Sequence, residues 1–531
     1  MSMVSPTVDH AGMARYHPPQ DVLDAGRLSV YQLFCQSARR QPDKIALSDR
    51  GRKYSYQQTL ERVQRLAAAL SESGVRYGDR IAVLLENRIE YIEIHLAAAS
   101  LGAIVACQNW RLSDSELHHC VQLVAPGLLI YSQRYSEQAS ALQRQLDVPG
   151  MCIEDDYEDW LNKTTDSPID NFEDLEAGLL ILYTSGTTGP AKAAVISHRA
   201  LIARMHLLAI DLNVSADDGF VAWSPMFHMG GSEHSLSTLM LGGTVFVADG
   251  FDVAYIVELI DSEKLGWLLL VPATIERLVE ELDQSGTQAL GVKCVGAMAD
   301  LLPKQQIALV SRRLNAPFLN TFGATETGIA PASNGLIEPG IEPTSLSKKL
   351  NSFCALRLEN ENYSDAPIGV TGEALVKGPT LFSGYWDNEE VNKRDFAGGW
   401  FRMGDLFKRN PDGTVDFMGR AKYLIKSGGE NIYPAEIEQI LLSNEQVRDA
   451  IVVAFPDPKW GEVPVAVVAV ENEADTELVP QLLQACKNGL AKYKCPRRIV
   501  FVDFDLLPRS SSGKIIRSDV EIWLQKQGGD S

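Results

Sequence analysis

Residues 183–192 read Tyr-Thr-Ser-Gly-Thr-Thr-Gly-Pro-Ala-Lys and follow directly on the apolar run Leu179–Leu182. An apolar run that ends in a segment rich in glycine and hydroxyl side chains is typical of a buried strand that leads into a loop. Glycines let the backbone turn tightly and present its N–H groups to an anion. The hydroxyl groups add further donors and Lys192 adds a positive charge, so this segment predicts a phosphate-binding loop.

The loop differs from the Walker A phosphate motif. That motif needs a lysine directly after its last glycine and then Ser or Thr. Here Pro190 and Ala191 separate Gly189 from Lys192, and Ala193 follows the lysine. A different way of holding phosphates is therefore expected. For this loop taken alone, the alternative is a surface turn that binds no ligand.

The composition is that of a large globular protein with an acidic surface. The chain has 531 residues, of which 45% are hydrophobic and 22% charged, and its formal net charge is -20. An acidic surface argues against nucleic acid as a partner, although local lysines and arginines can still form an anion site. The eight cysteines form no C-x-x-C pair, so reduced thiols are expected rather than a zinc or disulfide framework.

No targeting or membrane segment is predicted. The first twenty residues lack the apolar core of a signal peptide,. The longest apolar stretch, residues 96–107, is interrupted by Ser100 and is too short to span a bilayer,. We therefore expect a cytoplasmic protein with no membrane span, and a homodimer is the commonest assembly to expect for it.

Helical and strand patterns alternate along the first two thirds of the chain. Helices are predicted over residues 56–70 and 90–102, and strands over residues 80–85, 104–107, 220–223, 244–247 and 268–271. Such alternation predicts βαβ units with parallel sheets. From about Pro367 short strand-like runs replace the helices, which predicts a small β-rich unit. A boundary is expected near residues 419–422, before a separate α+β unit.

Other segments combine glycine with residues that can do chemistry. They are Pro225-Met-Phe-His-Met-Gly-Gly231, Asn320-Thr-Phe-Gly-Ala-Thr-Glu-Thr-Gly328, Trp400-Phe-Arg-Met-Gly-Asp405, Gly419-Arg-Ala-Lys422 with Ser427-Gly-Gly-Glu-Asn431, and Pro508-Arg-Ser-Ser-Ser-Gly-Lys-Ile515. In this order, together with the first loop, they resemble the adenylate-forming superfamily of acyl-CoA synthetases, luciferases and peptide-synthetase adenylation domains. The resemblance runs from about Tyr54 to Arg517, nearly the whole chain.

The resemblance implies an α/β fold. Its large N-terminal domain has two βαβ-layered subdomains and a small β-barrel-like subdomain, and a small, mobile α+β domain follows. The corresponding boundaries are an N-terminal arm over residues 1–25, the large domain over 26–420 and the C-terminal domain over 421–531.

The resemblance also implies a reaction in two halves, with ATP, Mg²⁺ and coenzyme A as cosubstrates. A carboxylate attacks the α-phosphate of ATP to give acyl-AMP and pyrophosphate. A thiol then attacks the acyl carbon and releases AMP. Since an anion attacks a polyanion, the site must supply positive charge and exclude water.

Roles for individual residues follow from the matching motifs. The catalytic candidates are Lys514, Glu326, His228 and Thr184, and Glu326 is also the Mg²⁺ ligand. The candidate contacts with ATP or AMP are Thr184, Ser185, Gly186, Thr187, Thr188, Gly189, Lys192, Gly296, Ala297, Asn320, Thr321, Phe322, Gly323, Thr325, Asp405, Arg420 and Lys514. In these roles Phe322 packs on adenine, Asn320 bonds its amino edge and Asp405 binds the ribose hydroxyls.

The remaining assignments concern the acid, the thiol and the domain movement. The acyl pocket candidates are Trp223, His228, Gly231, Ser232, Val271, Thr274 and Gly328. Lys422 is the hinge, and the candidate contacts with CoA are Lys426, Gly428, Gly429 and Glu430. The small residues of the pocket would leave room for a fatty, aromatic or other apolar acid. Ala191, Ala193 and Met403 depart from the family's usual residues.

The resemblance thus implies a carboxylic acid–CoA ligase. Three alternatives to this function stay open. A stand-alone adenylation enzyme would load the thiol of a carrier protein instead of CoA. A catalytically silent binding protein could use the same fold, although Lys192, Glu326, Asp405 and Lys514 argue against it. A luciferase-like oxygenase is the third alternative, and no residue specifically favours it.

Overall fold

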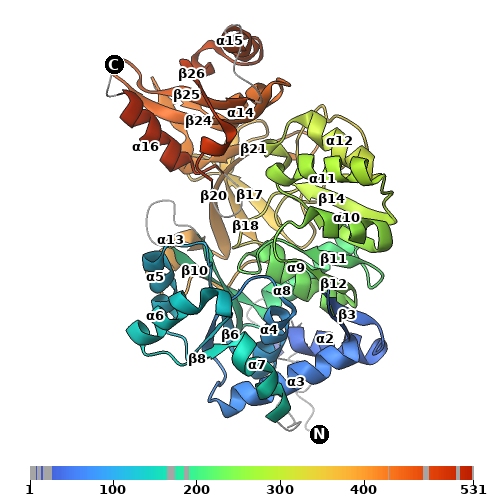
Figure 1. Cartoon of the computed structure of the whole chain (residues 1–531). Coiled ribbons are helices and arrows are strands. Elements are labelled where there is room, and N and C mark those ends of the chain that lie inside the picture. The colour runs from blue at the N-terminus through green and yellow to red at the C-terminus, as the bar shows by residue number, and fades with distance from the viewer. Residues whose placement is uncertain are drawn as a thin grey trace.

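The computed structural model describes residues 7–8, 14–15, 27–163, 174–184, 191–428, 430–470, 478–509 and 515–528. Two large sheets and a smaller one form the N-terminal part, and a fourth sheet with its own helices forms a separate C-terminal unit above them (Figure 1). A short hairpin, β1 (Thr7–Val8) with β2 (Ala14–Arg15), lies near the N-terminus. The predicted α/β fold with a large and a small domain is confirmed.

The first large sheet has six strands in the order β10-β9-β6-β5-β7-β8. Its strands are β5 (Arg80–Leu84), β6 (Ile104–Cys107), β7 (Leu128–Tyr131), β8 (Gly150–Cys152), β9 (Gly178–Thr184) and β10 (Lys192–Ser197). The helices between them are α4 (Ile89–Leu101), α5 (Asp114–Val124), α6 (Ser136–Leu146) and α7 (Ile153–Lys163). All neighbours are parallel except β9 and β10, which pair antiparallel on either side of the glycine-rich loop.

The second large sheet has eight strands in the order β16-β15-β14-β13-β11-β12-β3-β4. Its strands are β3 (Ile45–Ser48), β4 (Lys53–Ser55), β11 (Gly219–Ala222), β12 (Thr244–Val247), β13 (Lys264–Leu269), β14 (Gly291–Ala297), β15 (Phe318–Asn320) and β16 (Leu336–Ile337). Its helices are α2 (Val30–Arg40), α3 (Tyr56–Glu72), α8 (His198–Asp211), α9 (Met229–Leu241), α10 (Val253–Ser262), α11 (Pro272–Ser285) and α12 (Lys304–Leu314). Because β3 and β4 join this sheet before the chain builds the other one, the two sheets form one body.

The main core lies between the two large sheets. Helix α4 has almost every side chain buried, including Tyr91, Ile94 and Leu96. Its two glutamates are buried as well, and each is paired with arginine: Glu90 with Arg52 and Arg88, and Glu93 with Arg62,. Helix α3 begins at a capping box in which Ser55 and Gln58 satisfy each other's backbone N–H groups,. The capping residues in the sequence thus define where α3 starts, and the apolar residues of α4 indicate that it lies in the core.

The third sheet is curled and antiparallel. It contains β17 (Ala355–Glu359), β18 (Thr371–Lys377), β19 (Phe396–Ala397), β20 (Trp400–Arg409) and β21 (Val415–Arg420), with α13 (Glu389–Asp395) beside it. The predicted β-rich unit therefore exists, but it begins with β17, before Pro367. The short alternation in Ala-Leu-Arg-Leu-Glu is weaker than the glycine-rich pattern that follows it, so the sequence did not reveal this first strand.

The C-terminal unit packs helices on a mixed sheet. Its strands are β22 (Ile425–Ser427), β23 (Glu430–Ile432), β24 (Val447–Asp457), β25 (Gly461–Val470) and β26 (Arg498–Val502), and its helices are α14 (Pro434–Leu442), α15 (Leu478–Gly489) and α16 (Arg517–Gly528). It contacts the large domain through few polar pairs. Arg448 bonds Glu276 at 3.3 Å and Asn431 bonds Glu361 at 3.4 Å.

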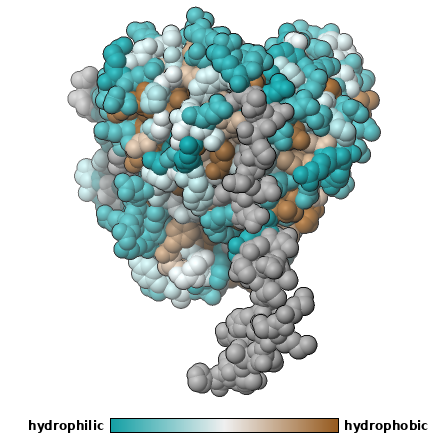
Figure 2. All heavy atoms as spheres, turned by 90° about the horizontal axis from the view of Figure 1, so that it is seen from below, coloured by the Kyte–Doolittle hydropathy of each residue, from teal (hydrophilic) through white to brown (hydrophobic). Residues whose placement is uncertain are grey.

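The surface agrees with the charge balance. The face turned away from the C-terminal unit is mostly hydrophilic, with hydrophobic residues in small separate groups (Figure 2). Within the described residues no helix combines the length and apolar character needed to cross a membrane.

Candidate active site

The glycine-rich loop starts and ends at the edge of the first large sheet. Thr184 ends β9, Lys192 begins β10, and the two residues face each other in the register of this hairpin. Ser185, Gly186, Thr187, Thr188 and Gly189 lie outside the described residues. Ala193 does not belong to the loop. It lies within β10, is 1% exposed and packs against Ile104 and Ile181.

Lys192, Tyr385 and Glu326 meet at the mouth of this hairpin. The Nζ atom of Lys192 lies 3.9 Å from the centre of the Tyr385 ring, a cation–π contact. The Tyr385 hydroxyl donates a hydrogen bond of 2.7 Å to Oε1 of Glu326. Burial lowers the pKa of Lys192, while the carboxylates of Asp395 and Glu326 act in the opposite direction. A half-buried cation and a carboxylate are thus held on either side of one phenol.

Backbone pairing holds Tyr385 in this place. The segment 383–386 runs beside β10, where Ser383 N–H donates to the Val195 carbonyl and Trp386 N–H to the Ala193 carbonyl. Ala194 and Tyr385 form an isolated β-bridge. Two segments far apart in the sequence are therefore joined at the strand that carries Lys192.

A closed turn over residues 323–328 presents Glu326. Ala324 and Gly328 exchange both backbone hydrogen bonds, at 3.1 and 2.8 Å. A Cβ atom added to Gly323 would lie 2.1 Å from the Gly328 carbonyl oxygen, so this position requires glycine,. The Glu326 carbonyl accepts from Phe382 N–H at 2.9 Å. Both the main chain and the side chain of Glu326 are thus bonded to the 382–385 segment.

Asp405 and Arg420 lie opposite each other on β20 and β21. Asp405 is 1% exposed, and one of its carboxylate oxygens lies 2.9 Å from Nε of Arg420. Arg420 also acts electrostatically on Lys192 and Tyr385. The third sheet therefore adds a cation and a carboxylate to the same region as Glu326. Met403 points into the core of this sheet and is 8% exposed.

Two of the predicted adenine contacts are already surrounded by protein. The ring centre of Phe322 lies 4.7 Å from that of Phe407 and 5.3 Å from that of Phe417. Asn320 donates to the Leu346 carbonyl at 2.8 Å, and its Oδ1 accepts from the buried Lys348 ammonium. Their roles toward adenine stay predictions, as do those of the neighbouring Gly296, Ala297, Thr321, Gly323 and Thr325.

The acyl pocket candidates lie where β11 and β13 end and where α9 and α11 begin, except Gly328, which closes the turn over residues 323–328. His228 is the N-cap residue of α9. Ser232 is buried and donates its hydroxyl to the Met226 carbonyl. Thr274 bonds the Val271 carbonyl at 2.8 Å, and the Trp223 indole donates to the Leu269 carbonyl at 2.7 Å. These polar groups are therefore engaged with the main chain.

The glycines of this region allow close contact rather than open space. A Cβ atom on Gly231 would lie 2.5 Å from the Pro225 carbonyl oxygen, and one on Gly296 would lie 2.9 Å from Nε1 of Trp267. One on Gly328 would lie 2.7 Å from Cδ of Arg204. These three positions therefore require glycine because neighbouring groups pack against the main chain there.

The residues assigned to the hinge and to CoA lie at the junction with the C-terminal unit. Lys422 stacks on Tyr423, with Nζ 4.1 Å from the ring centre, and burial followed by the charge of Arg420 lowers its pKa to about 8. Gly428, at φ +59°, packs beneath Trp460, while Lys426 and Glu430 are exposed. Gly429 and Lys514 lie outside the described residues.

Several residues near the site were not found from the sequence. They are Tyr385, Arg204, Glu233 and Trp267. The sequence Gly384-Tyr385-Trp386 could have indicated Tyr385, because a glycine followed by two aromatic residues marks a turn that carries large side chains. The sequence did not indicate a role for Arg204 or Glu233, because a single charged residue in a helical segment is normally interpreted as exposed to solvent.

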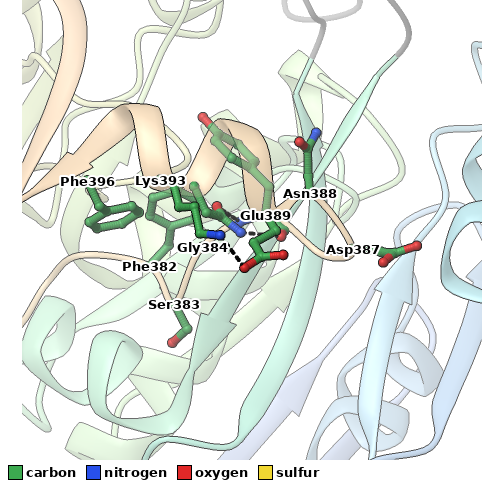
Figure 3. A pocket seen from close by; sticks show the side chains of 10 residues that line it. Phe382, Ser383, Gly384, Asp387, Asn388, Glu389, Lys393 and Phe396 are labelled. Atoms are coloured by element: carbon green, nitrogen blue, oxygen red, sulfur yellow. Dashed lines mark hydrogen bonds and ion pairs between the residues drawn. The ribbon is translucent and has the colours of Figure 1, made fainter.

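A surface hollow of about 630 Å³ lies beside the active-site segment. Its lining is Phe382, Ser383, Gly384, Tyr385, Asp387, Asn388, Glu389, Asn392, Lys393 and Phe396. In Figure 3 Lys393 and Glu389 bridge its rim, and neither Glu326 nor Lys192 lines it. Tyr385 lines this hollow and also bonds Glu326, so the hollow adjoins the Glu326 turn.

The residues at Glu326 suit a cation that arrives with phosphates. Among the residues that the structure describes, no three His, Cys, Asp or Glu side chains gather into a metal site. A single carboxylate matches Mg²⁺, which usually binds one or two carboxylates and takes its other ligands from water and substrate phosphates.

Comparisons with known proteins identify the family of the chain. The family model described as AMP-binding enzyme matches residues 34–386, and that of the AMP-binding enzyme C-terminal domain matches residues 436–514. The indoleacetate–CoA ligase of Aromatoleum aromaticum is 34% identical over 496 residues, which is 90% of this chain and 95% of that protein. The feruloyl-CoA synthase of an Amycolatopsis species is 32% identical over 91% of this chain and 96% of its own.

A solved structure extends the likeness to three dimensions. The o-succinylbenzoate CoA synthetase of Bacillus subtilis, in complex with its acyl-adenylate intermediate, matches with a TM-score of 0.80 and 26% identity. The match covers 92% of this chain and 97% of that one.

The two family models, matched in order over most of the chain, define an adenylate-forming enzyme. The chain belongs to the AMP-binding enzyme family. It is an acid–thiol ligase of the acyl-CoA synthetase class, which uses ATP and CoA, as predicted from the sequence.

Proposed function

We propose that this enzyme joins an aryl or arylalkyl carboxylic acid to coenzyme A. The acid's carboxylate attacks the α-phosphate of ATP, pyrophosphate leaves, and the CoA thiol then displaces AMP from the acyl carbon. The observation that carries this proposal is the convergence of Lys192, Tyr385 and Glu326 at the edge of the glycine-rich loop. These groups supply positive charge and a cation ligand where phosphate charge must be held.

Each residue has a task in this proposal. Lys192 and the loop hold the β- and γ-phosphates, and Glu326 binds the Mg²⁺ that accompanies ATP. Asp405 accepts hydrogen bonds from the ribose. Lys514 stabilises the charge that develops at the α-phosphate, and His228 lies beside the acyl carbon. Rotation of the C-terminal unit at Lys422 brings Lys426, Gly428 and Glu430 to the CoA path.

A wall of aromatic side chains supports a compact acid. Trp267 is 5% exposed and lies between α9 and β14, with its ring centre 4.6 Å from that of His234. His234 also packs against Phe220 at 5.7 Å. Burial lowers the pKa of His234 to about 3, so its ring is neutral and apolar in character. Met229, the residue after His228, packs against the apolar cluster that contains Trp267. In this proposal the ring of the acid lies against that cluster.

The names of the relatives favour the same class of acid. They are given as ligases of indoleacetate, ferulate and 2-succinylbenzoate, all of which carry an aromatic ring. A planar ring can pack edge-on or offset against these aromatic side chains, whereas a long flexible chain needs a channel. We expect this enzyme to be cytoplasmic. We also expect it to form a homodimer, and size-exclusion chromatography with light scattering would test that oligomeric state.

A pyrophosphate-release screen tests the proposal. Benzoate, phenylacetate, indoleacetate, cinnamate and a series of fatty acids are compared with and without CoA. We expect acid-dependent pyrophosphate release with the ring acids and acyl-CoA only when CoA is present. No release with any acid would refute the ligase. Release that needs a carrier protein, and not CoA, to give a thioester would favour the carrier-loading alternative.

A further inference from the structure

Arg204 is a buried arginine with bonds in three directions. It lies on α8 and is 4% exposed. One terminal nitrogen, Nη1, contacts Oε1 of Glu233 at 2.5 Å. Its Nε atom donates to the Thr380 carbonyl at 3.0 Å, and Nη2 donates to the Thr325 carbonyl at 3.1 Å. The planar guanidinium can serve these partners at once, because its donors point outward in a fixed fork.

The two carbonyls belong to the segments that hold Glu326. Thr325 directly precedes Glu326, and Thr380 lies just before Phe382, whose N–H bonds the Glu326 carbonyl at 2.9 Å. The same segment carries Tyr385, which bonds the Glu326 side chain. Arg204 therefore joins the two segments directly behind the carboxylate.

Glu233 fixes the orientation of Arg204 and belongs to a different part of the site. It is 2% exposed and lies on α9, one turn after His228. A buried carboxylate needs its partner, since an unpaired charge is costly in the interior. Gly328 leaves the space that the arginine occupies, because a Cβ atom there would lie 2.7 Å from Cδ of Arg204.

We propose that Arg204 is a positioning residue that holds the Glu326 turn in register with the Tyr385 segment and links both to α9 through Glu233. The proposal rests on the proposed role of Glu326 as the ligand of the ATP-bound Mg²⁺. Under this proposal the position of Glu326 depends on α9, the helix that also begins beside the proposed acid site at His228. An outer partner that orients a ligating carboxylate typically contributes about 10- to 100-fold to metal affinity or activity.

Binding of ATP at stepped Mg²⁺ concentrations, measured by calorimetry, tests this role without turnover. In Arg204→Gln we expect the Mg²⁺-dependent part of ATP affinity to fall by about 10- to 100-fold. Affinity for ATP without Mg²⁺ should change much less, because the loop and Lys192 are not touched. Loss of fold alone would lower the fraction of binding sites and leave the Mg²⁺ midpoint of the remaining sites in place. An unchanged midpoint in Arg204→Gln overturns the proposal.

Two further variants separate orientation from charge. Arg204→Gln leaves the Glu233 carboxylate buried without its partner, so the double variant Arg204→Met/Glu233→Leu removes both charges together, a replacement that folded proteins often tolerate. If the single variant does not fold, the proposal is tested with this double variant. We expect its Mg²⁺-dependent ATP affinity to fall as in the single variant. Glu233→Gln keeps an amide oxygen that can accept from Nη1 of Arg204, as well as both carbonyl bonds, and should retain most of that dependence.

Arg199 offers a matched control on the same helix. It donates to the Leu381 carbonyl at 3.1 Å and pairs with Glu176 at 2.7 Å. It thus holds the same 379–381 loop from the outside and, among the residues that the structure describes, makes no hydrogen bond to the Glu326 turn. Arg199→Gln should shift the Mg²⁺ midpoint much less than Arg204→Gln. An equal shift would mean that any loosening of the loop suffices, which overturns a specific role for Arg204. Pyrophosphate release by the wild-type enzyme reports separately on the proposed function.

Discussion

The Tyr385 hydroxyl donates a 2.7 Å hydrogen bond to the Glu326 carboxylate while its ring lies beneath the Lys192 ammonium at 3.9 Å. One phenol thus sets the separation between a cation expected to bind phosphates and a carboxylate expected to bind Mg²⁺. Burial and the Glu326 charge raise the pKa of Tyr385 far above its ordinary value, so it stays a hydrogen-bond donor at every working pH.

Replacing Tyr385 with Phe removes this donor and keeps the ring. We expect the Mg²⁺ concentration for half-maximal pyrophosphate release to rise, and kcat to fall by about 10- to 100-fold, because the carboxylate loses the bond that orients it. The KM for the acid should change little. Unchanged Mg²⁺ activation in this variant would contradict the role of Tyr385.

Lys514→Ala should separate the two half-reactions. Acyl-AMP formation from acid and ATP should be lost, since the cation that offsets charge at the α-phosphate is gone. Thioester formation from supplied acyl-AMP should be largely retained. Single-turnover assays of each half measure this directly. Equal loss of both halves would rule out a role confined to adenylation.

Lys422→Pro tests the hinge. Proline fixes φ near −65° and removes a backbone donor, so rotation at this residue should be hindered. We expect adenylation to persist and thioester formation to be impaired. Lys422→Ala is the control for the side chain alone. If the proline variant performs both steps normally, the hinge lies elsewhere.

The lowered pKa of Lys422 makes its effect on stability depend on pH. Its pKa is about 8 in the folded protein against 10.5 for a free lysine. Between these values the unfolded chain binds the additional proton, so stability gains with rising pH in this window. The Tm of the wild type should therefore rise relative to that of Lys422→Met from about pH 8 upward. A constant Tm difference across this window would contradict the shift.

Trp267→Ala should widen the range of acids. Removing the indole opens space behind Met229, so the kcat/KM ratio for octanoate over benzoate should increase by about tenfold or more. The same change can cost about 3–5 kcal/mol of stability, so Tm is measured alongside and Trp267→Phe serves as the milder variant. If the ratio of kcat/KM values is unchanged in both variants and they are folded, Trp267 does not limit the range of acids that the enzyme accepts.

Much of the architecture followed from local patterns. The strand predicted at residues 104–107 is β6, the helix predicted at 56–70 is α3 with two further residues, and the helix predicted at 90–102 is α4, which spans Ile89–Leu101. These elements have strong periodicity and clear end signals, such as the Ser55 capping box. The strand predicted at residues 268–271 instead spans Lys264–Leu269, because Pro272 begins a helix and the preceding Val271 serves as its N-cap.

The sequence by itself determined the order of the motifs, the α/β class and the class of reaction, because motifs of glycine, lysine and carboxylate residues at fixed spacings can be recognised without coordinates. Only the tertiary structure decided which groups surround them. It placed Tyr385 between Lys192 and Glu326, put Arg204 and Glu233 behind the Glu326 turn, and filled the space beside Gly296 with Trp267. These are contacts between segments far apart in the chain, and no local pattern encodes the distance between them.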